Sequence, residues 1–219
     1  MAIILKLESD NREFIIAPAG NHLARLFSIV DLGTQIVLWE GKEKEQRKLL
    51  FRFELHGKDN DGKPMVTEGG EPLTINKKYT WSMFETAKLR QHLEAWRGRA
   101  FTETELLGFN IEKVLDNFCM LTIVQGTNQS GKRFAKIEQI SSVPYDMKER
   151  GFPKGHNARI LFSLDEPVFD HQTFNALPEW IKTEVMGCPE YKDAMGYTPA
   201  PKSFKSHDPI DDMESDIPF

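Results

Sequence analysis

The order of extended and helical segments between residues 22 and 143 constrains the fold of this chain more than any other feature. Between residues 49 and 56, apolar side chains occupy every second position, from Leu49 to Leu55, as in a strand that buries one face. An extended pattern also covers residues 22–32, breaks at Gly33, and resumes over residues 35–40. The charged stretch 41–48 between these segments is expected to be a loop. Three further strands are expected at residues 73–81, 118–125 and 133–143, with a hairpin turn at 126–131.

One longer helix is expected between the third and fourth strands. Ser82 and Glu85 have the spacing of a capping box, which predicts that the helix begins there. Leu89, Leu93 and Trp96 then form a single apolar face at helical spacing. The order strand, strand, strand, helix, strand, strand is that of an OB-fold, a five-stranded Greek-key barrel that binds oligonucleotides across one face. We therefore expect a mainly β protein with this fold.

The C-terminal segment differs in character from the rest of the chain. From Ser206 onward there are five acidic residues and no Lys or Arg, which accounts for the net charge of −5. Such a polar stretch cannot bury enough apolar surface to offset the entropy of ordering, so a disordered acidic tail is expected. It finishes on an apolar tip with a carboxylate, which suits a basic pocket around a hydrophobic socket on a partner protein. The expected partner-binding residues are Asp211, Asp212, Asp216, Ile217, Pro218 and Phe219. The alternative is a tail that only adds solubility.

Two resemblances to known families follow from these segments. The terminal Asp216-Ile217-Pro218-Phe219, after an acidic run, resembles the terminus of bacterial single-stranded DNA-binding proteins, where it recruits replication and repair partners. The second set of motifs is His22-Leu23-Ala24-Arg25, Val30-Asp31-Leu32-Gly33-Thr34-Gln35, Tyr79-Thr80-Trp81-Ser82, Leu89-Arg90, Trp96-Arg97-Gly98-Arg99, Phe101-Thr102 and Gly131-Lys132-Arg133-Phe134-Ala135-Lys136-Ile137. These motifs resemble a family of phage single-stranded DNA-binding proteins. The resemblance implies an OB-type core and a role in phage replication or recombination inside a bacterial host.

The chain is expected to have three parts. Residues 1–145 form the predicted single-stranded DNA-binding domain. Residues 146–192, with a strand at 158–164 and a short helix at 178–186, form an extension that packs on the barrel. Residues 193–219 are a flexible tether and the acidic protein-interaction tail.

Binding of single-stranded DNA without sequence preference requires cations for phosphates and exposed aromatic rings for bases. The segment 132–137 fits best, because a strand places Lys132, Phe134 and Lys136 on one face and Ala135 and Ile137 on the other. The full set of expected DNA-binding residues is Arg25, Phe27, Trp39, Arg52, Lys77, Lys78, Tyr79, Lys132, Phe134 and Lys136. For each single aromatic residue, packing in the core is the alternative. Trp81 and Trp96 are assigned to the core.

Enzymatic sites are not indicated by the sequence. Residues 126–132 match the start of a P-loop, but Arg133 replaces the Ser or Thr that would hold Mg²⁺, and a strand pattern follows instead of a helix. The six His and two Cys residues show no metal-ligand spacing, so neither a metal nor a cofactor is expected. No apolar run is long enough to span a membrane, and the N-terminus lacks the layout of a signal peptide, so a cytoplasmic location in a bacterial host cell is expected.

These observations predict a non-catalytic protein that binds single-stranded DNA during phage DNA replication, recombination or repair and recruits partner proteins of host or phage through its acidic tip. Two alternatives stay open: a recombination mediator or strand-annealing protein, and a metal-dependent nuclease acting on the same substrate. The sequence leaves open whether the chain forms a homo-oligomer.

Overall fold

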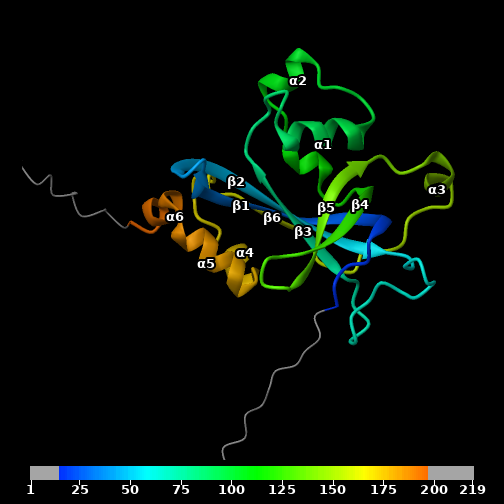
Figure 1. Ribbon diagram of the computed structural model, residues 1–219. Helices are drawn as coiled ribbons and strands as arrows, with labels where there is room; N and C mark the ends of the chain where they lie inside the picture. Colours follow the sequence, from blue (N-terminus) through cyan, green and yellow to red (C-terminus); the bar gives the residue numbers. More distant parts are fainter. Residues whose placement is uncertain (1–14, 197–219) are drawn as a thin grey trace, which may run out of the picture.

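The computed structural model describes residues 15–196, apart from the side chain of Trp39 (Figure 1). The described part is mainly β. Its strands are β1 (Gly20–Trp39), β2 (Lys42–His56), β3 (Thr74–Thr80), β4 (Phe118–Thr127), β5 (Arg133–Ser141) and β6 (Ile160–Phe162). Its helices are α1 (Lys88–Arg97), α2 (Glu103–Leu107), α3 (Tyr145–Glu149), α4 (His171–Ala176), α5 (Glu179–Gly187) and α6 (Pro189–Ala194), with a 3-10 turn η1 (Ile111–Val114).

All six strands belong to one sheet, with β1 at its centre. The strand order is β3-β2-β1-β4-β5, all neighbours are antiparallel, and β6 pairs in parallel with β1. β1 is 20 residues long because β2 accompanies it along most of its length, whereas β4 pairs only with its first six residues. Two bulges in β1, at Phe27 and Leu32, bend the strand. The long central strand thus connects the two halves of the sheet.

The sheet curves until its edge strands β3 and β5 approach each other. Lys77 of β3 donates a hydrogen bond from Nζ to the carbonyl of Ile137 in β5, at 2.7 Å. The concave side encloses the larger core, which includes Phe51, Phe53 and Leu121. Helix α1 covers this core with the apolar face that its sequence predicts. In Figure 1, α1 and α2 lie above the sheet, on the opposite side from α4 and α5.

A second, smaller core lies on the convex side of the sheet. There Val30, Leu32 and Leu50 pack against Ile181 and Val185 of α5 and against Phe162 of β6. Helices of this length are only marginally stable alone. Burial of their apolar surface against the strands stabilises them, by about 25 cal/mol for each Å² removed from water. The segment after residue 145 is therefore packed against β1 and β2 through β6 and α5.

Several boundaries differ from those that the sequence predicts. α1 begins at Lys88, because residues 82–87 form turns, and the Ser82 hydroxyl accepts a hydrogen bond from the amide of Phe84 instead of capping a helix. The charged stretch 41–48 is not a loop but the first half of β2, paired with β1. Gly33 does not end a strand: its φ of 66° allows the chain to continue past the Leu32 bulge.

The two tryptophans assigned to the core have different positions. Trp96 is buried, and its indole N–H donates to the carbonyl of Phe118 at 2.9 Å, as a core position requires. Trp81 is 42% exposed, so its assignment to the core is wrong. β3 ends at Thr80, and the alternation that points Ile75 and Tyr79 inward does not extend to Trp81.

Candidate nucleic-acid interface

Three lysines from different elements gather where β3, α1 and β5 meet. Lys77 comes from β3, Lys88 from the first residue of α1, and Lys136 from the middle of β5. The only carboxylate that interacts with all three, among the described residues, is that of Glu138, which Lys136 contacts at 2.8 Å. We call Lys77, Lys88 and Lys136, together with Phe134, the lysine surface.

The positive charge of this surface affects the pKa values of its own members. Burial lowers the pKa of Lys77, and the ammonium groups of Lys136 and Lys88 lower it further against the pull of Glu138. The hydrogen bond and charge of Lys136, followed by the charges of Lys77 and Lys88, lower the pKa of Glu138. Three cations share one anion, so the surface retains a net attraction for a further anion such as a phosphate.

Phe134 supplies an aromatic face beside these cations. It is 41% exposed, whereas Ala135 and Ile137 turn toward the core, as the alternation of β5 predicts. The ring lies across the backbone of Gly126 on β4: a Cβ at Gly126 would stand 2.8 Å from the ring's Cζ atom. Glycine at this position therefore lets one face of Phe134 rest on the sheet while the other faces solvent, which is the geometry of a stacking platform.

The hairpin between β4 and β5 extends the same edge of the molecule. Asn128 organises its turn, since the side-chain carbonyl accepts from the amides of Ser130 and Lys132 at 3.1 and 2.8 Å. Lys132 is exposed at the end of this turn, next to β5. Three expected residues, Lys132, Phe134 and Lys136, thus lie on one exposed segment.

Arg52 occupies a different place, on the convex face of β2. It pairs with Ser28 of β1 and with Asn76 of β3, and its guanidinium lies 5.0 Å above the ring of Phe27. Neither Nε of Arg52 nor the hydroxyl of Ser28 has a hydrogen-bond partner among the described residues. Burial lowers the pKa of Arg52. Lys78, nearby on β3, is engaged with Glu184 of α5 at 2.6 Å.

Three expected DNA-binding side chains are buried and hold the fold together. Arg25 is bound to Glu54 and Asp116, Phe27 is 2% exposed, and Tyr79 is 3% exposed with its hydroxyl 2.8 Å from Nδ1 of His92. None of them presents a free charge or ring face to solvent, so these three assignments do not fit the structure. The side chain of Trp39 and residues 211, 212 and 216–219 lie outside the described part of the chain.

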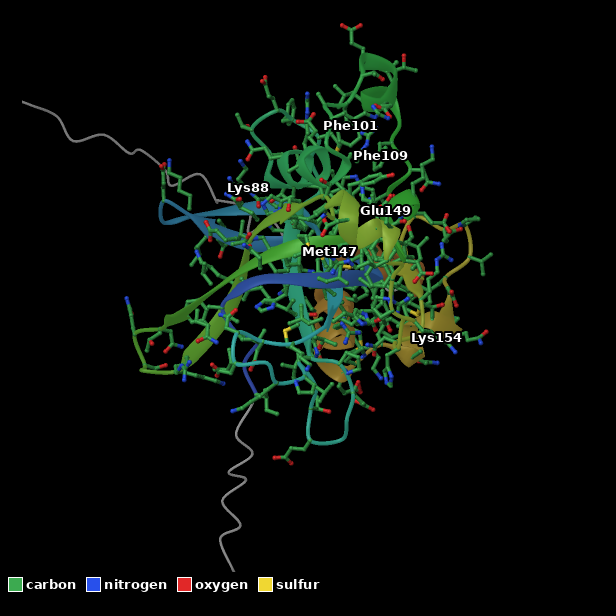
Figure 2. The ribbon with its side chains drawn as sticks, turned by 90° about the vertical axis from the view of Figure 1, so that its right-hand side faces the viewer. Lys88, Phe101, Phe109, Met147, Glu149 and Lys154 are labelled. Atoms are coloured by element: carbon green, nitrogen blue, oxygen red, sulfur yellow. The ribbon has the colours of Figure 1, made fainter. Side chains whose placement is uncertain are left out.

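Sequence patterns did not predict the positions of two exposed side chains, of which only Lys88 belongs to the lysine surface. Lys88 was missed because the helix was expected to begin at Ser82, which would have placed this lysine within the helix instead of at its start. Figure 2 shows Lys88 beside α1, away from Met147 and Glu149 of α3. The second is Trp81, whose ring lies 4.4 Å from the guanidinium of Arg47. No periodicity signals a ring that lies just beyond the end of a strand.

Other kinds of site find little support in residues 15–196. No group of three or more His, Cys, Asp or Glu side chains in this range is placed to hold a metal ion. Both cysteines are buried and free. None of the helices described above is long and apolar enough to cross a membrane.

Comparisons with known proteins found no match, so the functional assignment rests on the structure. No model of a protein family matches the sequence, and no curated protein matches it significantly.

Proposed function

We propose that the chain binds single-stranded DNA without sequence specificity and that the lysine surface is its principal contact. One observation carries the proposal: the charges of three ammonium groups act on a single carboxylate, that of Glu138, which Lys136 contacts at 2.8 Å, and the half-exposed ring of Phe134 lies on the same strand two residues before Lys136. Ammonium groups attract successive phosphates, and an open ring face accepts any base, since every base has a π-face. Such a surface does not read the edges of base pairs, so the binding should not depend on sequence.

The proposed fold supports the same role. The strand order, the helix between β3 and β4, and the approach of β3 to β5 are compatible with an OB-type barrel, and we propose that the sheet is one. In that fold, ligands bind near the loop between the fourth and fifth strands, where Lys132 and Phe134 lie.

The cellular part of the proposal rests on the sequence. The acidic segment 211–219 would recruit replication, recombination or repair proteins, and the protein itself would coat the strand without catalysing a reaction. Its place of action would be the cytoplasm of a bacterial host.

The test is fluorescence anisotropy with the full chain, labelled oligo-dT and a matching duplex. We expect tight binding to the single strand alone and binding about 5- to 150-fold weaker for Phe134→Ala, because one stacked base contributes about 1–3 kcal/mol. Trp180→Ala is the matched control, since Trp180 is 46% exposed and Phe134 41%. Equal affinity for single strand and duplex would remove the proposed function.

A further inference from the structure

The seam between α1 and β5 holds two separate hollows, and the first lies at the lysine surface. At its first end, Lys88 and His92 of α1 face Glu138 and Ile140 across a hollow of about 310 Å³. At its second end, Trp96 and Arg97 of α1 face Ser142 and Val143 across a cavity of about 300 Å³. We call the second cavity the end pocket. Along the helix axis, Lys88 and Arg97 are about 13 Å apart, since each residue of an α-helix rises about 1.5 Å.

The end pocket is cationic. Ten residues line it, of which Arg97, Lys113 and Lys148 carry positive charge and none is acidic. Within the described part of the chain, the ammonium groups of Lys113 and Lys148 have no hydrogen-bond or ion-pair partner. Arg97 binds Glu105 through Nη2, but its Nη1 has no hydrogen-bond acceptor among the described residues. Glu105 balances the charge of Arg97, whose guanidinium lies 4.2 Å from the ring of Phe101, so the two unpaired ammonium groups and the unused donor of Arg97 are what favour an anionic ligand.

The same pocket also offers an aromatic surface. Phe152 and Phe118 lie parallel, with ring centroids 4.5 Å apart and an interplanar angle of 6°. Phe118 is partly buried at the start of β4, whereas Phe152 is 44% exposed. The open face of Phe152 could therefore extend the stack by one further ring. A ligand with both a flat ring and an anionic group matches this lining, and a volume of about 300 Å³ is at the lower end of the range for small-ligand sites.

We propose that the end pocket binds one nucleotide of the strand, with its base stacked on Phe152 and its phosphates between Lys113, Lys148 and Arg97. The strand would then run from the lysine surface along the seam between α1 and β5. This inference rests on the proposed function and adds a second contact to it. Figure 2 shows Met147 and Glu149 of α3, which flank Lys148 in sequence, away from Lys88, so the two ends of the proposed path are separate on the molecule.

The first experiment uses the full chain and oligo-dT that carries 5-iododeoxyuridine, with ultraviolet cross-linking and peptide mapping. A cross-link at Phe152, in addition to one at Phe134, is the expected result. In anisotropy, Phe152→Ala and the double variant Lys113→Gln, Lys148→Gln should each bind at least about fivefold more weakly. Trp180→Ala and the double variant Lys58→Gln, Lys63→Gln are the matched controls, because these side chains are exposed on other elements.

Failure of this inference and failure of the proposed function give different results. If the wild type and Phe134→Ala behave as expected but Phe152 neither cross-links nor affects affinity, the end pocket is not part of the path. If the wild type does not bind oligo-dT, the proposed function fails, and amide chemical shifts of Asn117, Val143 and Phe152 on addition of thymidine 5′-monophosphate test the pocket alone. Shifts caused only by a peptide with the sequence of residues 211–219 would assign the pocket to the chain's own terminus and overturn the nucleotide.

Discussion

Arg25 donates a hydrogen bond from Nε to Oε1 of Glu54 at 2.7 Å, and both side chains are buried between the sheet and the segment that leads to β6. Glu54 also accepts from the amides of His156 and Asn157, at 3.0 and 2.8 Å. Arg25 in turn donates to the carbonyl of Asn157 at 2.6 Å. The pair therefore attaches residues 156 and 157 to β1 and β2, which is why an arginine expected to bind DNA belongs to the interior.

Glu54→Gln should lower the free energy of unfolding by about 3–5 kcal/mol at neutral pH, because it leaves a buried guanidinium with less compensating charge. Burial opposes ionisation of Glu54, but the hydrogen bonds from Arg25 and from Asn157 and His156 outweigh it and hold its pKa at about 2. The folded pKa lies below the ordinary value of 4.5, so this stabilisation is present above pH 4.5 and is lost as the pH falls toward 2.

Urea denaturation between pH 7 and pH 2 measures this effect. The wild type should lose more stability than Glu54→Gln as the pH falls from about 4.5 to 2. Glu112→Gln is the control, since Glu112 pairs with Arg159 on the surface and should contribute no more than about 1 kcal/mol. Parallel pH profiles for wild type and Glu54→Gln would contradict the assignment.

His92 should make the protein less stable in mild acid. Its burial, together with the charges of Lys77 and Lys88, lowers its pKa to about 4. As the pH falls below about 6.5, His92 binds a proton in the unfolded chain but not in the folded chain. The stability is therefore full above pH 6.5 and declines toward pH 4. The slope is at most about 1.4 kcal/mol per pH unit.

Thermal or urea unfolding between pH 5 and 7 isolates this histidine, because most carboxyl groups stay ionised there. His92→Gln should flatten the slope in that range. His171→Gln, exposed on α4, should not. A slope that persists in His92→Gln would show that another group is responsible.

The sequence predicts the strands well where one face is buried and poorly where both are exposed. Alternation from Leu49 to Leu55 identifies half of β2, and that half encloses the core. Residues 42–46 of the same strand carry no such pattern, because both faces of this part of the β1–β2 ribbon are largely open to solvent. Only the hydrogen bonds with β1 keep this part of β2 extended, and a pattern of side chains does not reveal backbone hydrogen bonds.

The residues of the candidate site also differ in whether a local sequence pattern predicts their positions. Lys132, Phe134 and Lys136 lie in one strand, so local alternation was enough to place them on one exposed face. Lys77 and Lys88 join them only through the approach of β3 to β5 and the position of α1, which depend on contacts between distant residues. Arg25 and Tyr79 were misplaced because a pattern does not reveal the partners that make a buried polar group stable.

Gly33→Ala should destabilise the packing of the C-terminal helices on β1. A Cβ at Gly33 would lie 2.7 Å from Cβ of Cys188 and 2.8 Å from Oε2 of Glu190, which itself accepts a hydrogen bond from the amide of Thr34. The collision and the positive φ together should lower the free energy of unfolding by about 2–4 kcal/mol.

Gly41→Ala separates the two causes. Gly41 has a φ of 76°, close to the 66° of Gly33, but nothing lies within 4 Å of its Cβ position. It should therefore show the conformational cost of about 1–2 kcal/mol without the collision. If urea denaturation showed the same loss of unfolding free energy in both variants, the C-terminal helices would be able to shift at Cys188 without an energetic cost.

If the lysine surface contacts phosphates, the affinity for single-stranded DNA should depend on the salt concentration, whereas stacking on Phe134 should not depend on it. Each phosphate contact with a single strand should contribute about 0.7 to the slope of log K against log salt concentration. Lys88→Gln and Lys136→Gln should each reduce this slope by about that amount, whereas Phe134→Ala should weaken binding at every salt concentration with an unchanged slope.

Glu138→Gln should instead strengthen binding, most of all at low salt, because it frees Lys136 from its carboxylate. Oligo-dT titrations at four salt concentrations measure all of these effects, with Lys192→Gln, on the exposed surface of α6, as the control. If Glu138→Gln left affinity and slope unchanged while Phe134→Ala weakened binding, the strand would contact the ring but not the lysines, and the phosphates would have to meet other cations.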